Sequence, residues 1–385
     1  MALPRNIVVL GSTGSIGRST LEVIAHSQGK LRIIGLAAHS SFPLLVEQAR
    51  VHLPKFVAAT DEASMADFDW SQLSKNVKLL RGPEALVQLA SLPEVDVVVA
   101  AVVGSAGLGG AWAALEAGKT LALANKETLV MAGPLVTRLA AKTGAKILPV
   151  DSEHSAVYQA LACGHRKEVR RVVLTASGGP FRRHTREQLA QVTVEDALAH
   201  PTWQMGRKIT VDSATMMKKA LEIIEARWLF DLRPDQISVV IHPQSVVHSL
   251  VEFVDGSVVA QMSPPDMKLP IQFALTWPER WESPSAKLDW SASLHLDFEP
   301  PDEDRFPALR LGHEVARSGG TAGAVLNAAN EAAVARFLSG TLRYHQIVPA
   351  CEAVLRNHEF DPSPTLAQLI ALDAWARTEV AQWNF

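Results

Sequence analysis

The chain has 385 residues, which at about 150 residues per domain predicts two or three domains. Hydrophobic residues make up 48% of it and charged residues 20%, so it has enough apolar side chains to exclude a disordered protein. The 37 Lys and Arg residues nearly balance the 40 Asp and Glu residues. This balance predicts neither a nucleic-acid-binding protein nor one held to a membrane by a basic segment.

The two cysteines, Cys163 and Cys351, are too few for a disulfide scaffold or a multi-thiolate zinc site. We expect both to be small buried side chains in a reducing compartment, the cytoplasm. The N-terminal apolar stretch is too short for a signal peptide. Residues 97–115 are uncharged but contain four glycines, which predicts a buried strand and a loop in place of a membrane span.

Short apolar runs alternate with helix-length segments in the first part of the chain. Runs that are apolar throughout, and not on alternate residues, indicate a parallel sheet covered on both faces. We therefore predict an α/β, Rossmann-like domain over residues 1–150. Its expected strands are residues 6–10, 31–37, 56–59, 95–103, 120–124 and 146–150.

The first of these strands leads into the segment GSTGSIG (11–17) and then into a predicted helix, 18–26. A strand, a glycine turn and a helix N-terminus together form the usual binding site for the pyrophosphate of a dinucleotide. The spacing is G-x-x-G-x-x-G and differs from the usual G-x-G-x-x-G, so a glycine turn required only by packing is the alternative.

The end of the second strand bears on the choice of cofactor. NAD enzymes place Asp or Glu there to bind the ribose 2′-hydroxyl, but this chain has no carboxylate in residues 37–41. The absence of that negative charge favours NADP. His39 and Ser41 could donate hydrogen bonds to its 2′-phosphate.

The pattern changes after residue 150. Residues 151–282 predict an α+β domain with strands at 172–176, 239–241, 246–254 and 257–262, the last two joined by an Asp255-Gly256 turn. Residues 178–207 have no clean periodicity and are expected to form a flexible loop that closes on a ligand. The proline-rich residues 283–307 predict a linker, and residues 308–385 predict a helical bundle that contains a helix at 322–338.

Three carboxylates are candidates for a metal site. On an extended backbone Asp151 and Glu153 would point the same way and suit a hard cation such as Mg²⁺ or Mn²⁺. The same residues fit equally well as the N-terminal cap of a helix over 155–161. Glu222 shares a helix face with Lys218 and Lys219.

That second helix, which we expect Ser213 to cap, has two interpretations as well. A dense Lys-Lys-Glu cluster among apolar residues would suit an anionic substrate beside a metal, and the alternative is a solvated face of ion pairs. Lys126 ends the strand 120–124, where parallel sheets bind ligands, but a single lysine there is usually a surface residue. Trp203, in the long loop, would be unexplained as an exposed side chain unless it closes on something.

Taken together these segments resemble the 1-deoxy-D-xylulose 5-phosphate reductoisomerase family. The resemblance covers essentially the whole chain in the right order. It is carried by the motifs GSTGSIG (11–17), LANKE (123–127), PVDSEHSA (149–156), SGGPFR (177–182), HPTWQMGRKITVDSATMM (200–217), HPQSVVHS (242–249), PPDMKLPI (264–271) and VLNAANEAAVARFL (325–338).

The resemblance implies an NADPH- and divalent-metal-dependent enzyme, usually a homodimer, with an NADPH domain, a catalytic domain and a C-terminal helical domain. It would rearrange and reduce 1-deoxy-D-xylulose 5-phosphate to 2-C-methyl-D-erythritol 4-phosphate in the non-mevalonate isoprenoid pathway. The cation would stabilise negative charge that develops on the oxygens of this sugar phosphate. Closure of the 178–207 loop would keep the reactive intermediate from water.

The resemblance also implies roles for individual residues, given in this chain's numbers. The metal ligands are Asp151, Glu153 and Glu222, and with Lys126 and His200 they form the catalytic set. The substrate would contact these residues except Asp151, and also Ser152, Ser177, Ser213, Lys218 and Lys219. NADPH would contact Thr13, Gly14, Ser15, Ile16, His39, Ser41, Asn125, Glu127 and Gly206. Ser245, His248 and Met267 would line or support the pocket.

The chain departs from the family pattern at two places. The family usually has Asn-Lys-Gly where this chain has Lys218-Lys219-Ala220, so an amide becomes an ammonium group that can donate but not accept a hydrogen bond. His39 and Ser41 stand where Gly and Asn are usual. Two other functions remain open: a general NAD(P) dehydrogenase, which leaves the three carboxylates unexplained, and a non-catalytic Rossmann-type protein, which the fold alone does not exclude.

Overall fold

The structure is a computed structural model, and it describes residues 3–384. The chain divides into two compact units, each built from several segments. The first comprises residues up to Thr128, Val136–Ser155 and Asp266–Ala286, and the second comprises Leu129–Leu135, Ala156–Pro265 and the residues from Lys287 onward. The division into domains 1–150, 151–282 and 308–385 is not tested by these units and stays a prediction.

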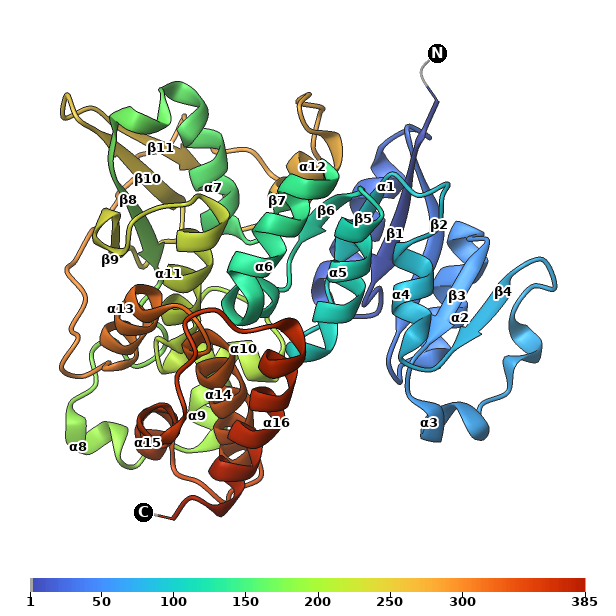
Figure 1. Ribbon diagram of the computed structural model, residues 1–385. Helices are drawn as coiled ribbons and strands as arrows, with labels where there is room; N and C mark the ends of the chain where they lie inside the picture. Colours follow the sequence, from blue (N-terminus) through green and yellow to red (C-terminus); the bar gives the residue numbers. More distant parts are fainter. Residues whose placement is uncertain (1–2, 385) are drawn as a thin grey trace. The chain divides into compact units, whose positions relative to one another are not determined.

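The first unit contains a parallel seven-stranded sheet with the strand order β4-β3-β2-β1-β5-β6-β7 (Figure 1). The order reverses between β1 and β5, which is the switch point where sheets of this kind bind ligands. The predicted Rossmann-like fold is therefore confirmed. The strands are β1 (Arg5–Leu10), β2 (Leu31–Ala38), β3 (Phe56–Ala59), β4 (Lys78–Arg81), β5 (Val97–Ala100), β6 (Thr120–Leu123) and β7 (Lys146–Pro149).

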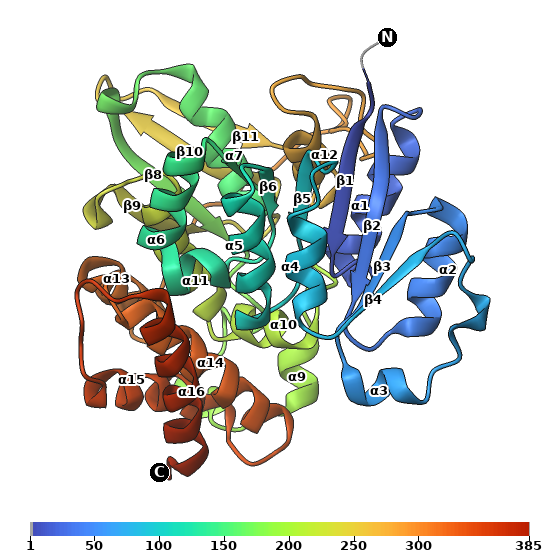
Figure 2. The same cartoon turned by 45° about the vertical axis from the view of Figure 1, so that its right-hand side comes forward.

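Helices cover both faces of this sheet. Because parallel crossovers are right-handed, α1 and α2 lie on one face and α4 and α5 on the other. Helix α12 contacts α1. Helix α4 contacts α5, and the two lie side by side in Figure 2. The helices are α1 (Ser15–His26), α2 (Phe42–His52), α3 (Glu62–Ala66), α4 (Glu84–Ala90), α5 (Leu108–Glu116), α6 (Glu127–Thr143, of which Leu129–Leu135 belong to the second unit) and α12 (Lys268–Thr276).

The apolar runs of the sequence became strands because both of their faces are covered. Ile7, Val8, Val9 and Leu10 of β1 are each 0% exposed. Strand β4 was missed: it is a short edge strand in which only Leu80 is buried, so its sequence has no apolar run to read. Residues 97–115 contain the predicted buried strand, β5, but the predicted loop after it is wrong from Leu108 onward, where α5 begins. Among the described residues no helix has the length and apolar character needed to cross a membrane.

The second unit contains a four-stranded sheet with the order β11-β10-β8-β9. Strand β9 pairs with β8 in parallel and the other pairs are antiparallel. The predicted turn at Asp255-Gly256 joins β10 to β11, and Gly256 takes the left-handed conformation that favours glycine, with φ of 87°. The strands are β8 (Val169–Ala176), β9 (Ile237–Ile241), β10 (Val247–Phe253) and β11 (Val258–Met262).

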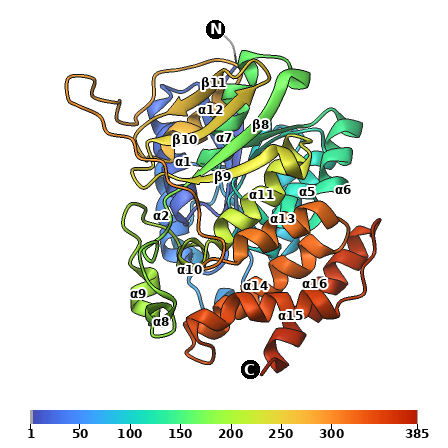
Figure 3. The same cartoon turned by 90° about the vertical axis from the view of Figure 1, so that its left-hand side faces the viewer.

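Helices complete the second unit, and the predicted helix 322–338 coincides with α14 (Figure 3). One hydrophobic core joins the four-stranded sheet, α11 and the C-terminal helices. The helices are α7 (Ser152–Ala160, which starts in the first unit), α8 (Arg186–Leu189), α9 (Val194–Leu198), α10 (Arg207–Ala214), α11 (Met217–Leu229), α13 (Ala308–Ser318), α14 (Ala322–Leu338), α15 (Ile347–Asn357) and α16 (Leu366–Gln382).

Four other local expectations were wrong. Residues 178–207 are not all loop, since α8 and α9 lie there, each started by a threonine capping box at Thr185 or Thr193. Ser213 does not cap α11; it lies in the last turn of α10. Residues 151–153 are not extended, because α7 begins at Ser152. Cys163 is exposed and only Cys351 is buried.

Candidate active site

The turn after β1 contains three glycines, and packing requires two of them but not the third. Gly11 has φ of 87°, and a Cβ there would lie 2.6 Å from the carbonyl oxygen of Ala101. A Cβ on Gly17 would lie 2.3 Å from the oxygen of Gly11. Gly14 is different, because its Cβ would meet only an ordinary contact, the Gly11 oxygen at 3.5 Å. Packing therefore explains Gly11 and Gly17 but leaves Gly14 unexplained.

Gly14 is the N-cap residue of α1 and provides no side-chain cap for the helix. Gly14 and Ser15 are exposed, and Thr13 and Ile16 are half-buried. The helix N-terminus thus presents backbone N–H groups at the switch point of the sheet, as an anion site requires. At the end of the neighbouring strand β2, His39 and Ser41 are exposed too.

Asn125, Lys126 and Glu127 follow β6 and are all buried, with 3%, 3% and 6% exposure. The Asn125 side chain forms hydrogen bonds with nearby backbone groups. Its amide nitrogen donates to the carbonyl oxygens of Val102 (2.6 Å) and Gly104 (2.9 Å). Its amide oxygen accepts from the N–H of Thr128 at 2.9 Å. Asn125 thus ties the loops after β5 and β6 together, and its contact with NADPH stays a prediction.

Lys126 is not the surface residue that the simpler interpretation expects. Its ammonium group pairs with the carboxylate of Asp151, which follows β7, and Asp151 is only 9% exposed. Ser152 donates to Oε2 of Glu153 at 2.5 Å. One oxygen of Asp151 and one of Glu153 lie within 4.8 Å of each other. The first unit therefore brings together Lys126 and three of the predicted residues of the 151–153 segment.

His154 was missed by the sequence analysis. It is 0% exposed, and one of its ring nitrogens lies within 4.8 Å of an Asp151 oxygen. The available signal was the spacing, because residues three apart at the start of a helix share a face. With its two carboxylates and imidazole, this end of α7 offers donors that suit a divalent cation.

In the second unit, α11 carries the predicted cluster of Lys218, Lys219 and Glu222. Both lysines pair with Glu222, one on each carboxylate oxygen. Glu222 is 0% exposed and Lys219 only 3%, so the face is not solvated. Buried charges are stable only where they are paired or bind ions. This cluster is therefore a candidate binding site for an ion or an anionic ligand, and not a solvent-exposed group of ion pairs.

His200 and Ser177 form the second cluster of that unit. The Nδ1 atom of His200 accepts from the backbone N–H groups of Thr202 (3.1 Å) and Trp203 (2.9 Å). The proton of the neutral ring must therefore lie on Nε2, which donates to Oγ of Ser177 at 3.2 Å. Ser177 also accepts from the N–H of Gly179 at 3.3 Å, so its own hydroxyl proton points elsewhere.

The charge state of His200 follows from its surroundings. Burial, and then the nearby Lys218 ammonium, lower the pKa of His200 from 6.5 to about 4. The ring is consequently neutral at physiological pH, and the Ser177 hydroxyl is left as a donor. A phosphate oxygen is a suitable acceptor for that hydroxyl.

Other predicted residues lie around these clusters. Ser213 is 8% exposed, and Gly206, the N-cap of α10, is exposed with nothing within 4 Å of where a Cβ would stand. Trp203 is half-buried, not exposed, and its ring centroid is 6.5 Å from that of His248. Ser245 belongs to the second unit with His248, whereas Met267 belongs to the first.

Three family models match the chain. The model for 1-deoxy-D-xylulose 5-phosphate reductoisomerase matches residues 7–133. The model for its C-terminal domain matches residues 147–230, and a model described as the DXP reductoisomerase C-terminal domain matches residues 262–379.

Relatives and solved structures agree with these models. The 1-deoxy-D-xylulose 5-phosphate reductoisomerase of Rhodopirellula baltica is 47% identical, covering 98% of this chain and 94% of the relative. That of Heliobacterium modesticaldum is 50% identical over 97% of this chain and 96% of the relative.

Among solved structures, the reductoisomerase of Zymomonas mobilis in complex with NADPH has a TM-score of 0.91 and 42% identity, covering 98% of both chains. A DOX-P reductoisomerase in complex with NADPH, fosmidomycin and magnesium has a TM-score of 0.92 and 42% identity, covering 98% of this chain and 97% of the other. The chain belongs to the 1-deoxy-D-xylulose 5-phosphate reductoisomerase family.

Proposed function

We propose that the chain converts 1-deoxy-D-xylulose 5-phosphate to 2-C-methyl-D-erythritol 4-phosphate by an isomerising rearrangement and an NADPH-dependent reduction that need a divalent cation. The observation that carries the proposal is the burial of paired opposite charges in both units. Lys126 pairs with Asp151, and Lys218 and Lys219 pair with Glu222; none of these five side chains is more than 16% exposed. A chain that only bound a dinucleotide would not need these costly buried groups.

NADPH binds in this proposal at the N-terminus of α1, where Gly14 leaves room for the pyrophosphate. Thr13, Ser15 and Ile16 flank that point, and Asn125, Glu127 and Gly206 are assigned to the same cofactor. His39 and Ser41 at the end of β2 are exposed donors for a 2′-phosphate and bring no negative charge to repel it. The bound cofactor supplies the hydride for the reduction.

The divalent cation is assigned to Asp151, Glu153 and Glu222, all at most 9% exposed. An all-oxygen donor set fits Mg²⁺ or Mn²⁺. The cation stabilises negative charge on substrate oxygens. The magnesium in related solved structures supports this assignment.

The substrate is held by the chain's own donors. Lys126 and Ser152, beside Asp151, are assigned to the oxygens near the reacting carbonyl. His200, kept neutral, holds Ser177 in a fixed orientation, so the Ser177 hydroxyl can donate to the phosphate. Ser213, Lys218 and Lys219 are assigned to the phosphate as well. Glu153 and Glu222 are assigned to the hydroxyl groups of the substrate.

The segment 178–207, which contains α8 and α9, has in this proposal the role of excluding water from the reactive intermediate. Its half-buried Trp203 rests near His248 and provides an apolar cover. The homodimer and the cytoplasmic location that the resemblance implies belong to the proposal as well. Light scattering of the purified chain tests the dimer.

The test of the function is a spectrophotometric assay of NADPH oxidation by the purified protein. We expect oxidation only when 1-deoxy-D-xylulose 5-phosphate and Mg²⁺ or Mn²⁺ are both present, and we expect a chelator to stop it. Turnover without a divalent cation would refute the carboxylate assignment, and turnover with an unrelated sugar phosphate alone would refute the substrate.

A further inference from the structure

The junction between α10 and α11 links two groups of proposed substrate residues. Ser213 lies in the last turn of α10, and the lysines and Glu222 lie in the first two turns of α11. Only Thr215 and Met216 separate the two helices. Their backbone conformation therefore fixes how Ser213 is placed relative to the charged side chains of α11.

This junction holds an unusual backbone conformation. Met216 has φ of 62°, the left-handed region that side chains other than glycine rarely adopt. The hydroxyl of Thr215 donates to the oxygen of Val211 at 3.2 Å and accepts from the N–H of Met217 at 3.3 Å. Such a conformation persists only where the surroundings hold it, so the contacts made to the junction from elsewhere matter.

The first of these contacts comes from Tyr344, which is 6% exposed. Its hydroxyl donates to the carbonyl oxygen of Ala214 at 2.7 Å. Its ring packs edge-on against Phe181, with ring centroids 5.2 Å apart. Phe181 lies four residues after Ser177, so one tyrosine of the C-terminal segment touches both chain segments that carry the proposed phosphate donors.

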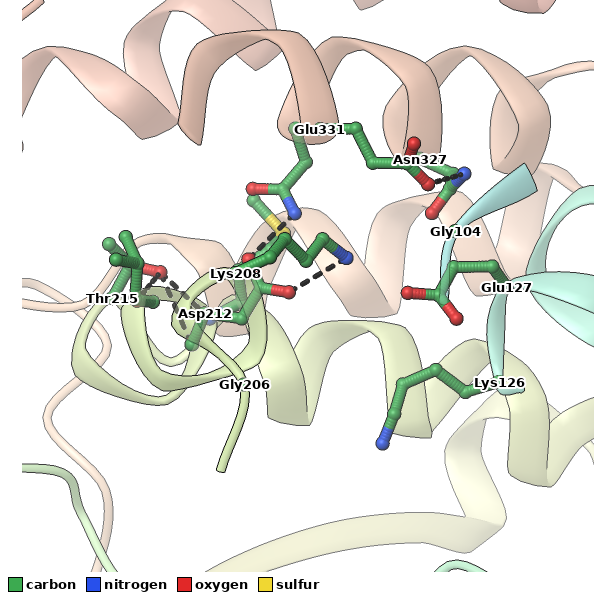
Figure 4. Close-up of polar contacts among 12 residues, drawn as sticks. Gly104, Lys126, Glu127, Gly206, Lys208, Asp212, Thr215, Asn327 and Glu331 are labelled. Atoms are coloured by element: carbon green, nitrogen blue, oxygen red, sulfur yellow. Dashed lines mark hydrogen bonds and ion pairs between the residues drawn. The ribbon is translucent and has the colours of Figure 1, made fainter. Parts of the chain in front are cut away.

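The second contact is made one residue before Ser213. The carboxylate of Asp212 is 1% exposed and accepts from the amide nitrogen of Asn330 in α14 at 2.8 Å. Its other oxygen pairs with Lys208 at 2.8 Å, as Figure 4 shows. Because a carboxylate can only accept hydrogen bonds, Asp212 requires that the nitrogen of the Asn330 amide, and not its oxygen, points toward α10.

The two donor segments touch each other directly. Gly179 has φ of 66°, and a Cβ there would lie 2.7 Å from the carbonyl oxygen of Ser213. Gly179 also donates its N–H to the Ser177 hydroxyl. A shift of Ser213 would consequently push against the Ser177 turn, and the two hydroxyls depend on one backbone contact.

We propose that Tyr344 and Asn330 are positioning residues for substrate binding. They act through Ala214 and Asp212, the two neighbours of Ser213. They hold the Ser213 and Ser177 hydroxyls in positions from which both can donate to the phosphate. The inference rests on the proposed function, because it takes these two serines as substrate donors. It gives the C-terminal helices a part in recognition of the sugar phosphate.

The central test is Tyr344→Phe, which removes one oxygen and keeps the ring on Phe181. Loss of a single buried hydrogen bond predicts an increase of about three- to tenfold in KM for 1-deoxy-D-xylulose 5-phosphate. We expect KM for NADPH to be unchanged and kcat to change by less than about twofold, because the hydroxyl that is removed donates to Ala214, which is neither a proposed cofactor residue nor a member of the charged cluster on α11.

A second pair of variants tests the other contact. Asp212→Asn and Asn330→Asp should each raise KM for the substrate. The double variant again offers one amide and one carboxylate to this contact but not the ion pair of Asp212 with Lys208, so its increase in KM should be smaller than the product of the two single increases. KM values that simply multiply in the double variant would overturn the role of this contact.

The control is Val380→Ala in α16, which creates a cavity among the C-terminal helices at a residue that is 0% exposed. It should lower the melting temperature and leave KM unchanged. If Val380→Ala raises KM as much as Tyr344→Phe, the effect is one of stability and the inference fails. It fails as well if Tyr344→Phe binds the substrate with wild-type affinity in calorimetric titration, which needs no turnover. A wild-type chain without turnover would refute the proposed function instead.

Discussion

Replacement of Lys218 by Asn tests whether this lysine competes with the divalent cation for Glu222. The Lys218 ammonium pairs with one oxygen of a carboxylate that is 0% exposed, and Lys219 pairs with the other. A cation that binds Glu222 competes with the two lysines for the same oxygens. Lys218→Asn removes the contact from the more accessible of the two lysines and puts back the amide that the family usually has.

The magnitude follows from the strength of the contact that is lost. A hydrogen bond to a charged group contributes about 1.5–3 kcal/mol. At tenfold for every 1.4 kcal/mol, the apparent dissociation constant for Mg²⁺ should fall roughly ten- to hundredfold. Turnover with saturating metal should be retained or improved, since an amide can still donate to the substrate.

The assay is NADPH oxidation as a function of Mg²⁺ concentration, with both substrates saturating. Arg356→Gln is the control for net charge: it removes one positive charge from a pair with Glu352 that spans one helical turn of α15. Its metal dependence should match that of the wild type. An unchanged metal constant for Lys218→Asn would refute the competition, and complete loss of turnover would show that Lys218 has a role of its own.

Three further predictions concern the same sites. Glu222→Gln should abolish metal-dependent turnover but keep NADPH binding, seen by fluorescence titration, and should lower the free energy of unfolding by about 3–5 kcal/mol because Lys219 is left buried beside a neutral group. Wild-type turnover would place the metal elsewhere. Gly14→Val should raise KM for NADPH at least about tenfold with little change in melting temperature, whereas Gly17→Ala should lower the melting temperature, since its Cβ would lie 2.3 Å from a backbone oxygen; equal effects of the two would contradict the assignment of Gly14. His200 has a pKa of about 4 when folded against 6.5 when unfolded, so its contribution to stability is complete above pH 6.5 and is lost as the pH falls toward 4. The melting temperatures of the wild type and His200→Gln should therefore converge over that range, and parallel curves would contradict it.

The strands of the first unit could be predicted because strands that are buried on both faces have mostly apolar sequences. Both faces of β1 and β5 are covered, so their central residues are apolar. The predicted bounds of β1, 6–10, lie within one residue of the structure, whereas the predicted strand 95–103 is longer than β5 at both ends. Strand β4 lies at the edge of the sheet with one buried residue, and an edge strand needs no apolar run. Apolar runs therefore fail to predict a strand that is little buried, but they do predict short strands that are buried.

The helix boundaries of the second unit were harder to predict because local signals compete there. Ser213 before a run of helix-forming residues fits a helix cap, but the chain already forms α10 up to Ala214. The left-handed Met216 that follows α10 has no signal in the sequence, and the Tyr344 hydroxyl that bonds to the nearby Ala214 lies 130 residues further along the chain. By contrast, the capping boxes at Thr185 and Thr193 were local signals and could have been read.

The candidate site shows why residue types alone left its two interpretations balanced. A lysine three or four residues from a carboxylate, as Lys219 and Lys218 are from Glu222, looks the same in sequence whether the pair faces water or the protein interior. What distinguishes the two is exposure, and Lys126 and Lys219 are each 3% exposed. Desolvation of an ammonium group is unfavourable by several kcal/mol unless a carboxylate or an anionic ligand compensates for it. Burial of these lysines consequently means that Asp151 and Glu222 already stabilise them, and that any cation recruited to the carboxylates must leave the ammonium groups facing a new negative partner. A phosphorylated substrate brings such a partner, so cation and substrate are expected to favour each other's binding at this site.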